Sequence, residues 1–226
     1  ADAAVEKGKS IDQFKEGYRN VIRDLEKEVQ KALNLPAPDG LIPMEKKDAK
    51  ILYVALAGAH SIVNPAIIFN AARENWTLSF FEAVNFGFFA GDPEKANFIA
   101  QRIIKEATAL NVKEVVIVEC GTAFRILRAL MGRLPFRVSS IVEVIHRYLK
   151  EGKIRVKEGA VSDAVTYHDP CQLGRNGGVF EEPREVIRKI VTDYREMSPT
   201  RVQNWCCGGG GGLVALDNEE FRIKSG

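Results

Sequence analysis

The chain of 226 residues is long enough to bury a sizeable core, either as one large α/β domain or as two smaller ones. Hydrophobic residues make up 46% and charged residues 27%, which excludes a disordered chain. With 32 basic and 30 acidic residues the net charge is +2, so we expect no nucleic acid partner. No run of 18 apolar residues is available to cross a bilayer.

Residues 1–47 are predicted to form an amphipathic helix and a linker. Apolar residues recur at intervals of three and four from Ser10, a suitable N-cap, to Leu33. The following stretch, 34–47, contains three prolines and Gly40, a composition typical of a linker.

Residues 48–150 are predicted to be the first of two similar halves. Its strands are short and apolar, as in a sheet covered on both faces by helices, and are expected at 51–58, 76–80 and 115–120. Its helices are expected at 65–73, 92–110, 122–132 and 139–151.

Residues 151–226 are predicted to be the second half. We expect a strand at 164–168, a helix at 181–193 and a last strand at 202–205. The alternation of strands and helices predicts an α/β fold, with two pseudo-equivalent βαβ halves that contain parallel sheets and follow the N-terminal helix.

The four cysteines each follow a predicted strand. Open parallel sheets place ligands at the carboxyl ends of their strands, so Cys120, Cys171 and the pair Cys206-Cys207 are expected to converge. Adjacent cysteines make poor disulfides, because their Cα atoms are only about 3.8 Å apart. Four cysteines are also too few for a disulfide-stapled secreted scaffold. We therefore interpret them as reduced thiols of a cytoplasmic protein.

The strongest pattern is His168-Asp169-Pro170-Cys171, then 34 residues, then Cys206-Cys207 and five glycines. Thiolates are natural ligands of iron-sulfur clusters. Gly208 and Gly209 can adopt positive φ and bring backbone N–H groups close to cluster sulfur. The same three thiols would suit a zinc ion, or could be small buried hydrophobic residues. Neither Lys-Ser nor Lys-Thr follows the glycines, which disfavours a phosphate-binding loop.

These motifs resemble the cysteine-rich CCG domain of heterodisulfide reductases and related oxidation subunits. The segments YHDPCQLGRNGGVFEEPREVIRKI (167–190) and NWCCGGGGGLV (204–214) are most similar to iron-sulfur subunits of the DsrK type and to the D subunit of heterodisulfide reductase. VNFGFFAGD (84–92) and VECGTAFRIL (118–127) are similar to the same subunits. The resemblance covers about residues 50–226.

The resemblance implies a [4Fe-4S] cluster, of unusual and even noncubane form, held by Cys171, Cys206 and Cys207. It also implies an oxidoreductase subunit in an anaerobe, of the kind found in sulfate reduction. Electrons would come from quinol through a haem-containing membrane subunit and other iron-sulfur subunits. The chain would lie peripherally on the cytoplasmic membrane, and its substrate would be a disulfide or trisulfide on a small sulfur-carrier protein.

The sequence departs from the family pattern in three places. The terminal Cys-x-x-Cys does not occur before Gly226, and the N-terminal ferredoxin-like domain is missing. Ala123 stands where the first half would carry its second cysteine, so we expect no complete cluster in that half.

Two further residues are candidates for catalysis. Cys120 could be a ligand or a thiol that engages the substrate, although a lone cysteine that closes an apolar strand is commonly a core residue. His168 could protonate a leaving thiolate, because imidazole titrates near neutral pH, or it could have a structural role through Asp169.

Two rival functions remain open. One is an iron-sulfur subunit for glycerol-phosphate, lactate or glycolate oxidation. The other is a non-catalytic docking module stabilised by zinc.

Overall fold

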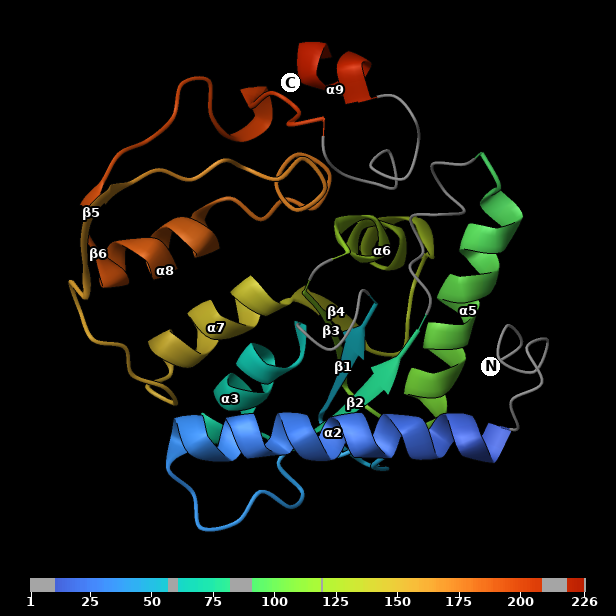
Figure 1. The fold of residues 1–226 in the computed structure, drawn as a ribbon. Helices are drawn as coiled ribbons and strands as arrows, with labels where there is room; N and C mark the ends of the chain where they lie inside the picture. The colour runs from blue at the N-terminus through green and yellow to red at the C-terminus, as the bar shows by residue number, and fades with distance from the viewer. Residues whose placement is uncertain (1–10, 57–60, 82–90, 119, 209–218, 226) are drawn as a thin grey trace.

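A four-stranded parallel sheet forms the centre of the chain (Figure 1). The computed structural model describes residues 11–56, 61–81, 91–118, 120–208 and 219–225. Strand order is β2-β1-β3-β4, and the strands are β1 (Ile51–Ala55), β2 (Trp76–Phe80), β3 (Glu114–Ile117) and β4 (Arg137–Ser140). All three strand pairs are parallel. The predicted α/β fold is therefore confirmed, and 76–80 is an edge strand as expected.

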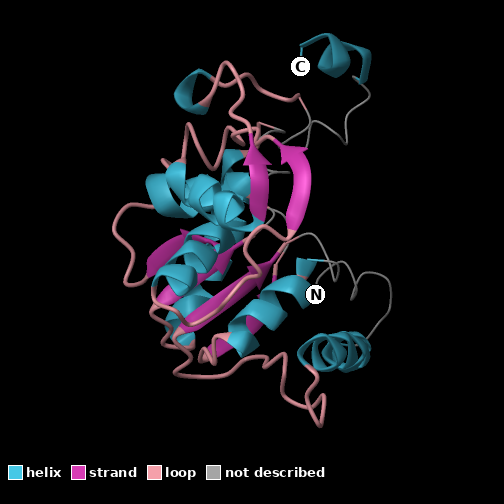
Figure 2. Cartoon of the chain, turned by 90° about the vertical axis from the view of Figure 1, so that its left-hand side faces the viewer, coloured by secondary structure: helices cyan, strands magenta, loops and turns pink. Residues whose placement is uncertain are grey.

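A second, two-stranded parallel sheet belongs to the other end of the chain. It pairs β5 (Val161–Val165) with β6 (Val191–Tyr194), joined through helix α8 (Glu181–Ile190). Figure 2 shows this pair apart from the main sheet. The β5–α8–β6 unit repeats the connection β1–α3–β2, in which α3 is Val63–Ala71. The division of the chain at 47/48 and 150/151 stays a prediction.

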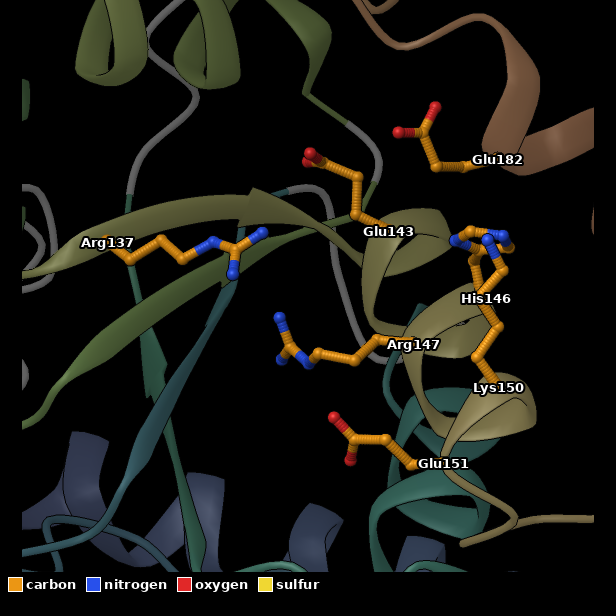
Figure 3. Close-up of a pocket in the computed structure, with 7 residues that line it drawn as sticks. All are labelled: Arg137, Glu143, His146, Arg147, Lys150, Glu151 and Glu182. Carbon is orange, nitrogen blue, oxygen red and sulfur yellow. The ribbon is translucent and has the colours of Figure 1, made fainter.

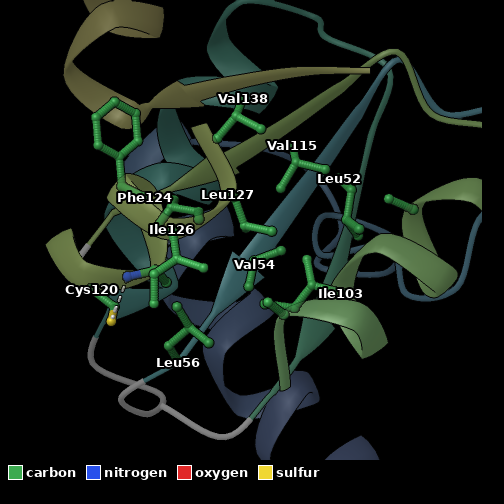
Figure 4. Close-up of a cluster of buried hydrophobic side chains, with 14 of the residues drawn as sticks. Leu52, Val54, Leu56, Ile103, Val115, Cys120, Phe124, Ile126, Leu127 and Val138 are labelled. Atoms are coloured by element: carbon green, nitrogen blue, oxygen red, sulfur yellow. Dashed lines mark hydrogen bonds between the residues drawn. The ribbon is translucent and has the colours of Figure 1, made fainter. Parts of the chain in front are cut away.

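Helices cover both faces of the main sheet. The remaining helices are α2 (Ile11–Leu33), α5 (Pro93–Ala109), α6 (Gly121–Arg125), which continues into the π-helix Ile126–Leu130, α7 (Ile141–Lys150) and α9 (Glu219–Ser225). Strand residues alternate between two buried clusters, because successive side chains of a strand point to opposite faces. Leu52 and Val54 pack with α5 and α6 (Figure 4), whereas Tyr53 packs with α2, α3 and α7.

Local sequence signals explain where these helices begin. Asp92 caps α5, and its side chain accepts a hydrogen bond of 2.9 Å from the Lys95 backbone N–H. Ser140 and Glu143 form a reciprocal capping box at the start of α7. The N-terminal helix is confirmed over Ile11–Leu33, whereas its proposed cap Ser10 lies outside the described residues.

The predicted linker is not helical, but it is part of the folded body. Ile42 is 2% exposed, and its N–H donates a hydrogen bond of 2.9 Å to the buried carboxylate of Glu26 in α2. The Pro43 carbonyl accepts a hydrogen bond of 2.7 Å from Leu78 N–H, and Met44 forms a parallel bridge with Leu78. The linker thus protects the open edge of β2.

Four sequence-based expectations about strands and helices were wrong or incomplete. The strand expected at 164–168 is β5, Val161–Val165, three residues earlier in the chain. β4 was missed. The helix expected at 181–193 ends at Ile190, and β-branched Val191 and Thr192 begin β6 instead. The strand expected at 202–205 is absent from the described residues there, which form a 3-10 turn, Arg201–Gln203, and an extended segment. Cys206-Cys207 therefore does not follow a strand. Within the described residues, no helix is long and apolar enough to cross a membrane.

The packed linker leads to a stability prediction. Ile42→Ala should lower the free energy of unfolding by about 2 to 5 kcal/mol, because it opens a cavity beneath the edge of the sheet. Urea denaturation monitored by circular dichroism measures this loss. Leu35→Ala is the matched control in the same segment, at 36% exposure, and should cost about 1 kcal/mol or less. Equal costs for the two variants would contradict a packed linker.

Candidate functional site

Three of the four cysteines lie at one place in the structure. Cys171 is half-buried in a turn-rich loop after β5, and Cys206 and Cys207 are exposed on the extended segment after the 3-10 turn. The Cys171 thiol lies within electrostatic range of the thiols of Cys206 and Cys207. Burial raises the pKa of the Cys171 thiol, and the nearby Cys206 and Cys207 raise it further.

Hydrogen bonds from side chains to backbone carbonyls join the two cysteine segments. His168 Nε2 lies 3.0 Å from the carbonyl oxygen of Trp205, and the amide of Asn204 donates 2.6 Å to that of Asp169. Arg175 Nε donates 3.0 Å to the Val202 carbonyl, and its Nη2 donates to the Asn204 carbonyl. We call this set of four hydrogen bonds the carbonyl contacts. They substitute for the strand pairing that the second segment lacks.

The carbonyl contact of His168 determines which ring nitrogen carries a hydrogen. A carbonyl oxygen can only accept a hydrogen bond, so Nε2 of His168 must carry a hydrogen in this arrangement. Nε2 therefore binds the Trp205 backbone, which leaves Nδ1 as the second ring nitrogen.

A buried ion network adjoins the carbonyl contacts at Asp169. Arg184 is fully buried and forms two hydrogen bonds of 2.7 Å with the carboxylate of Asp169, which is 2% exposed. Arg184 also binds Glu196 at 2.7 and 2.9 Å. Asp169 in turn accepts hydrogen bonds from Thr200 Oγ1 and from Arg201 N–H. The residue two before Cys171 is thus tied to the turn that leads to Cys206.

The network shifts the acidity of both carboxylates. Burial alone would raise the pKa of Asp169, but hydrogen bonds from Arg184 and Arg201 outweigh it and lower the pKa. Hydrogen bonds from Arg184 lower the pKa of Glu196 to about 2. Both carboxylates are therefore charged in the folded protein near neutral pH.

The first half meets the cysteine loop through small residues. A Cβ at Gly121 would lie 2.7 Å from Cβ of Gln172, and a Cβ at Gly177 would lie 2.5 Å from the Phe124 ring. Only glycine allows this close approach, so α6 packs against the loop that begins at Cys171.

Cys120 lies at this contact but not in the open part of the site. It is 8% exposed, at the rim of the apolar cluster that Figure 4 shows. Its sulfur accepts a hydrogen bond of 3.3 Å from Ala123 N–H and caps α6. This placement accounts for Cys120 as a structural residue, and its catalytic role stays a prediction.

The donor set is of the kind that an iron-sulfur cluster takes. Thiolates are natural ligands of such clusters, and zinc also accepts them. Cys171, Cys206 and Cys207 come from two segments, and the adjacent pair is exposed. Among the described residues, no three His, Cys, Asp or Glu side chains are placed to hold a metal ion. Gly208 has φ +67°, and its N–H lies 3.5 Å from Cys206 sulfur, a hydrogen bond of the kind that tunes cluster sulfur. Gly209 lies outside the described residues.

A pocket elsewhere in the chain has a different chemistry. It lies by β4, α7 and the start of α8 (Figure 3), and its lining is charged throughout: Arg137, Glu143, His146, Arg147, Lys150, Glu151 and Glu182. His146 of α7 has a side chain only 16% exposed and contacts Glu185 of α8 at 2.7 Å. This pocket contains no cysteine and joins the two halves.

Sequence reasoning missed the residues that hold the site together. Arg175 and Asn204 are ordinary loop residues in the sequence, and Arg184 belongs to an amphipathic helix in which arginine normally faces solvent. Asp169 offered one signal, because a carboxylate beside an expected ligand needs a donor, but the sequence does not say which one.

Removal of the Asp169 charge should destabilise the second half. Asp169→Asn removes the more deeply buried of the two carboxylates that Arg184 binds, and breaking this buried ion pair should lower the free energy of unfolding by about 3 kcal/mol or more. Thermal and urea unfolding measure the loss. The control Asp193→Asn breaks the exposed pair with Arg195 and should change little. An Asp169→Asn chain as stable as the parent would contradict the anchoring role of the network.

The network also predicts a pH dependence. The pKa of Glu196 falls from the ordinary value of 4.5 to about 2 on folding, so its contribution is complete above pH 4.5. That contribution is lost as the pH falls from 4.5 towards 2. Urea titrations between pH 7 and pH 3 should show stability falling with acid, and falling less steeply in Glu196→Gln. Parallel pH profiles for parent and variant would contradict the assignment.

Comparison with known proteins agrees with this geometry. The sequence model of the CCG cysteine-rich domain matches residues 165–225, which include Cys171, Cys206 and Cys207. The D subunit of the dihydromethanophenazine:CoB–CoM heterodisulfide reductase of Methanosarcina acetivorans is 36% identical over 141 residues, 54% of this chain and 34% of that protein. The Hdr-like menaquinol oxidoreductase iron-sulfur subunit of Archaeoglobus profundus is 25% identical over 85% of this chain and 42% of its own length.

A third relative comes from another class of complex. The EtfAB:quinone oxidoreductase of Syntrophomonas wolfei is 30% identical over 51% of this chain and 16% of its own length. The chain thus spans well under half of each of these three relatives. No solved structure matches it significantly. Residues 165–225 thus match the cysteine-rich CCG domain, and the chain is homologous to the D subunit of heterodisulfide reductase and to Hdr-like menaquinol oxidoreductase iron-sulfur subunits.

Proposed function

We propose that the chain is an iron-sulfur electron-transfer subunit of a heterodisulfide-reductase-like complex, with Cys171, Cys206 and Cys207 as the protein ligands of a [4Fe-4S] cluster. The observation that carries this proposal is the set of carbonyl contacts between the two cysteine segments. It holds an exposed cysteine pair against a half-buried third thiol, although no strand pairing joins the two segments. A lone core cysteine needs no such support.

The proposed activity is reduction of a disulfide or trisulfide, on a small thiol or on a sulfur-carrier protein. A bound cluster would supply electrons one at a time to a two-electron cleavage. Cys206 and Cys207 keep one side of the site open to the sulfur substrate because they are exposed. His168 binds the Trp205 carbonyl through Nε2, and we propose that Nδ1 of the protonated ring gives a proton to a leaving thiolate.

The proposed electron source is quinol, with transfer through a haem-containing membrane subunit and further iron-sulfur subunits. The homology to a menaquinol oxidoreductase subunit supports this direction. We place the chain peripherally on the cytoplasmic side of the membrane and assign it to anaerobic sulfur metabolism, including sulfate reduction.

A second candidate function has specific support. The similarity to an EtfAB:quinone oxidoreductase favours a subunit that passes electrons from oxidation of an organic substrate to quinone. The same three cysteines would then carry electrons without binding a sulfur substrate. Addition of a small thiol or disulfide to the loaded protein distinguishes the two functions, since only a sulfur-binding cluster should change its electron paramagnetic resonance spectrum.

The ligand assignment is tested by single substitutions in the whole chain. Cys171→Ser, Cys206→Ser and Cys207→Ser should each lose most of the bound iron and sulfide after anaerobic reconstitution, because each removes a thiolate ligand. Cys120→Ser is the matched control and should keep both, since its sulfur caps α6. Iron and sulfide analysis with electron paramagnetic resonance gives the readout.

Three results would count against the proposal. Full iron and sulfide content in Cys206→Ser would remove that ligand from the set. Loss of the cluster only in Cys120→Ser would move the site to the first half. One zinc per chain without iron in the parent would favour the docking module.

A further inference from the structure

We infer that Arg175 is a positioning residue of the proposed cluster site, whose guanidinium sets how far Cys206 lies from Cys171. This inference rests on the proposed function, because it concerns the same three thiols. Arg175 lies four residues after Cys171, and its two hydrogen bonds reach the Val202 and Asn204 carbonyls on the segment that leads to Cys206.

Arg175 differs from its neighbours in what it binds. Three other arginines of the second half pair with carboxylates: Arg184 with Asp169, Arg195 with Asp193 and Arg201 with Glu181. Arg175 donates to two backbone carbonyls instead. A guanidinium placed on main-chain oxygens fixes backbone position, which a surface ion pair does not.

The loop that carries Arg175 is rigid on its own side. Asn176 N–H donates a hydrogen bond of 3.0 Å to the Cys171 carbonyl, and Gly174 N–H donates 2.8 Å to the Pro170 carbonyl. Gly177 is packed so tightly that a Cβ there would lie 2.5 Å from the Phe124 ring. The backbone at Arg175 is therefore fixed relative to both Cys171 and the core of the first half.

The opposite segment is tied to Asp169 at its start, through Arg201 N–H, and has few contacts beyond that point. Val202 is 61% exposed and Trp205 is 72% exposed, so apolar burial contributes little to its position. Asn204 and His168 each provide one bond to this contact, whereas Arg175 provides two. Loss of Arg175 should let the exposed cysteine pair move away from Cys171 while the buried ion network stays intact.

The two hydrogen bonds of Arg175 require the geometry of a guanidinium group. The planar guanidinium presents donors in a fixed fork, which allows Nε and Nη2 to reach two carbonyls that are two residues apart. A lysine ammonium keeps the charge but is a single point on a flexible stem. Arg175→Lys thus keeps the positive charge but loses the pair of hydrogen bonds, and Arg175→Gln loses both.

The first measurement needs no metal. In the iron-free chain, a small disulfide oxidises Cys171 and Cys206 to one protein disulfide and is itself reduced to two thiols. Because well-positioned thiols have a high effective concentration, we expect Arg175→Lys and Arg175→Gln to slow this closure by about tenfold. The pair is followed by peptide mapping, and Arg195→Lys, which alters an exposed ion pair, should close at the parental rate.

The second measurement uses the chain reconstituted with iron and sulfide. Arg175→Lys should give a broadened or shifted electron paramagnetic resonance spectrum at unchanged thermal stability, and Arg195→Lys should reproduce the parental spectrum. Because Arg175 is exposed, its variants should remain folded, and thermal unfolding verifies this.

The outcomes separate the two proposals. If the parent forms a cluster, and Arg175→Lys matches it in both spectrum and closure rate, the positioning role of Arg175 is overturned. If the parent forms no cluster, the proposed function fails, yet the closure rate still decides whether Arg175 positions the thiols. If Arg195→Lys slowed disulfide formation to the same extent, the inference would also be overturned, because the effect would not be specific to the hydrogen bonds of Arg175.

Discussion

The ion pair between Asp169 and Arg184 is the interaction on which the second half depends. Both side chains are removed from solvent, and the buried Asp169 carboxylate depends on the Arg184 guanidinium, which Glu196 also binds. Asp169 lies two residues before Cys171, and the same carboxylate accepts hydrogen bonds from Thr200 and Arg201, which lead to Cys206. One buried charge thereby determines where two distant segments of the chain meet. The thiols themselves contribute little to this arrangement.

The structure places rigid and open parts next to each other for a physical reason. The proposed exchange of electrons with a sulfur substrate would need an accessible site, and exposed segments lack the apolar burial that would fix them. Hydrogen bonds to backbone carbonyls solve this conflict, because they fix position without covering the side chains around Cys206. His168, Arg175 and Asn204 therefore act on the main chain and leave the thiols accessible.

Much of the fold could be predicted from the sequence, but less of the site could. Periodicity and caps located α2, α5 and the strands β1 to β3, because these signals are local. The strand expected before Cys206 failed, because its backbone is held by Asp169 and Arg175 from 27 to 35 residues away. The convergence of Cys171 with Cys206 was anticipated from motifs. The residues that produce it could not be, since a buried arginine and a loop asparagine carry no local signature.

Helix α6 packs against the loop that carries Cys171. Ala123, at the position where a second cysteine would stand, is fully buried, and the Cys120 sulfur caps the helix that contains it. That helix presents Gly121 and Phe124 to the loop at Gln172 and Gly177, where any larger residue than glycine would clash. The contact fixes the base of the Cys171 loop against α6, whereas the carbonyl contacts hold the segment that leads to Cys206. The position of Cys171 relative to Cys206 therefore depends on packing against α6 as well as on hydrogen bonds.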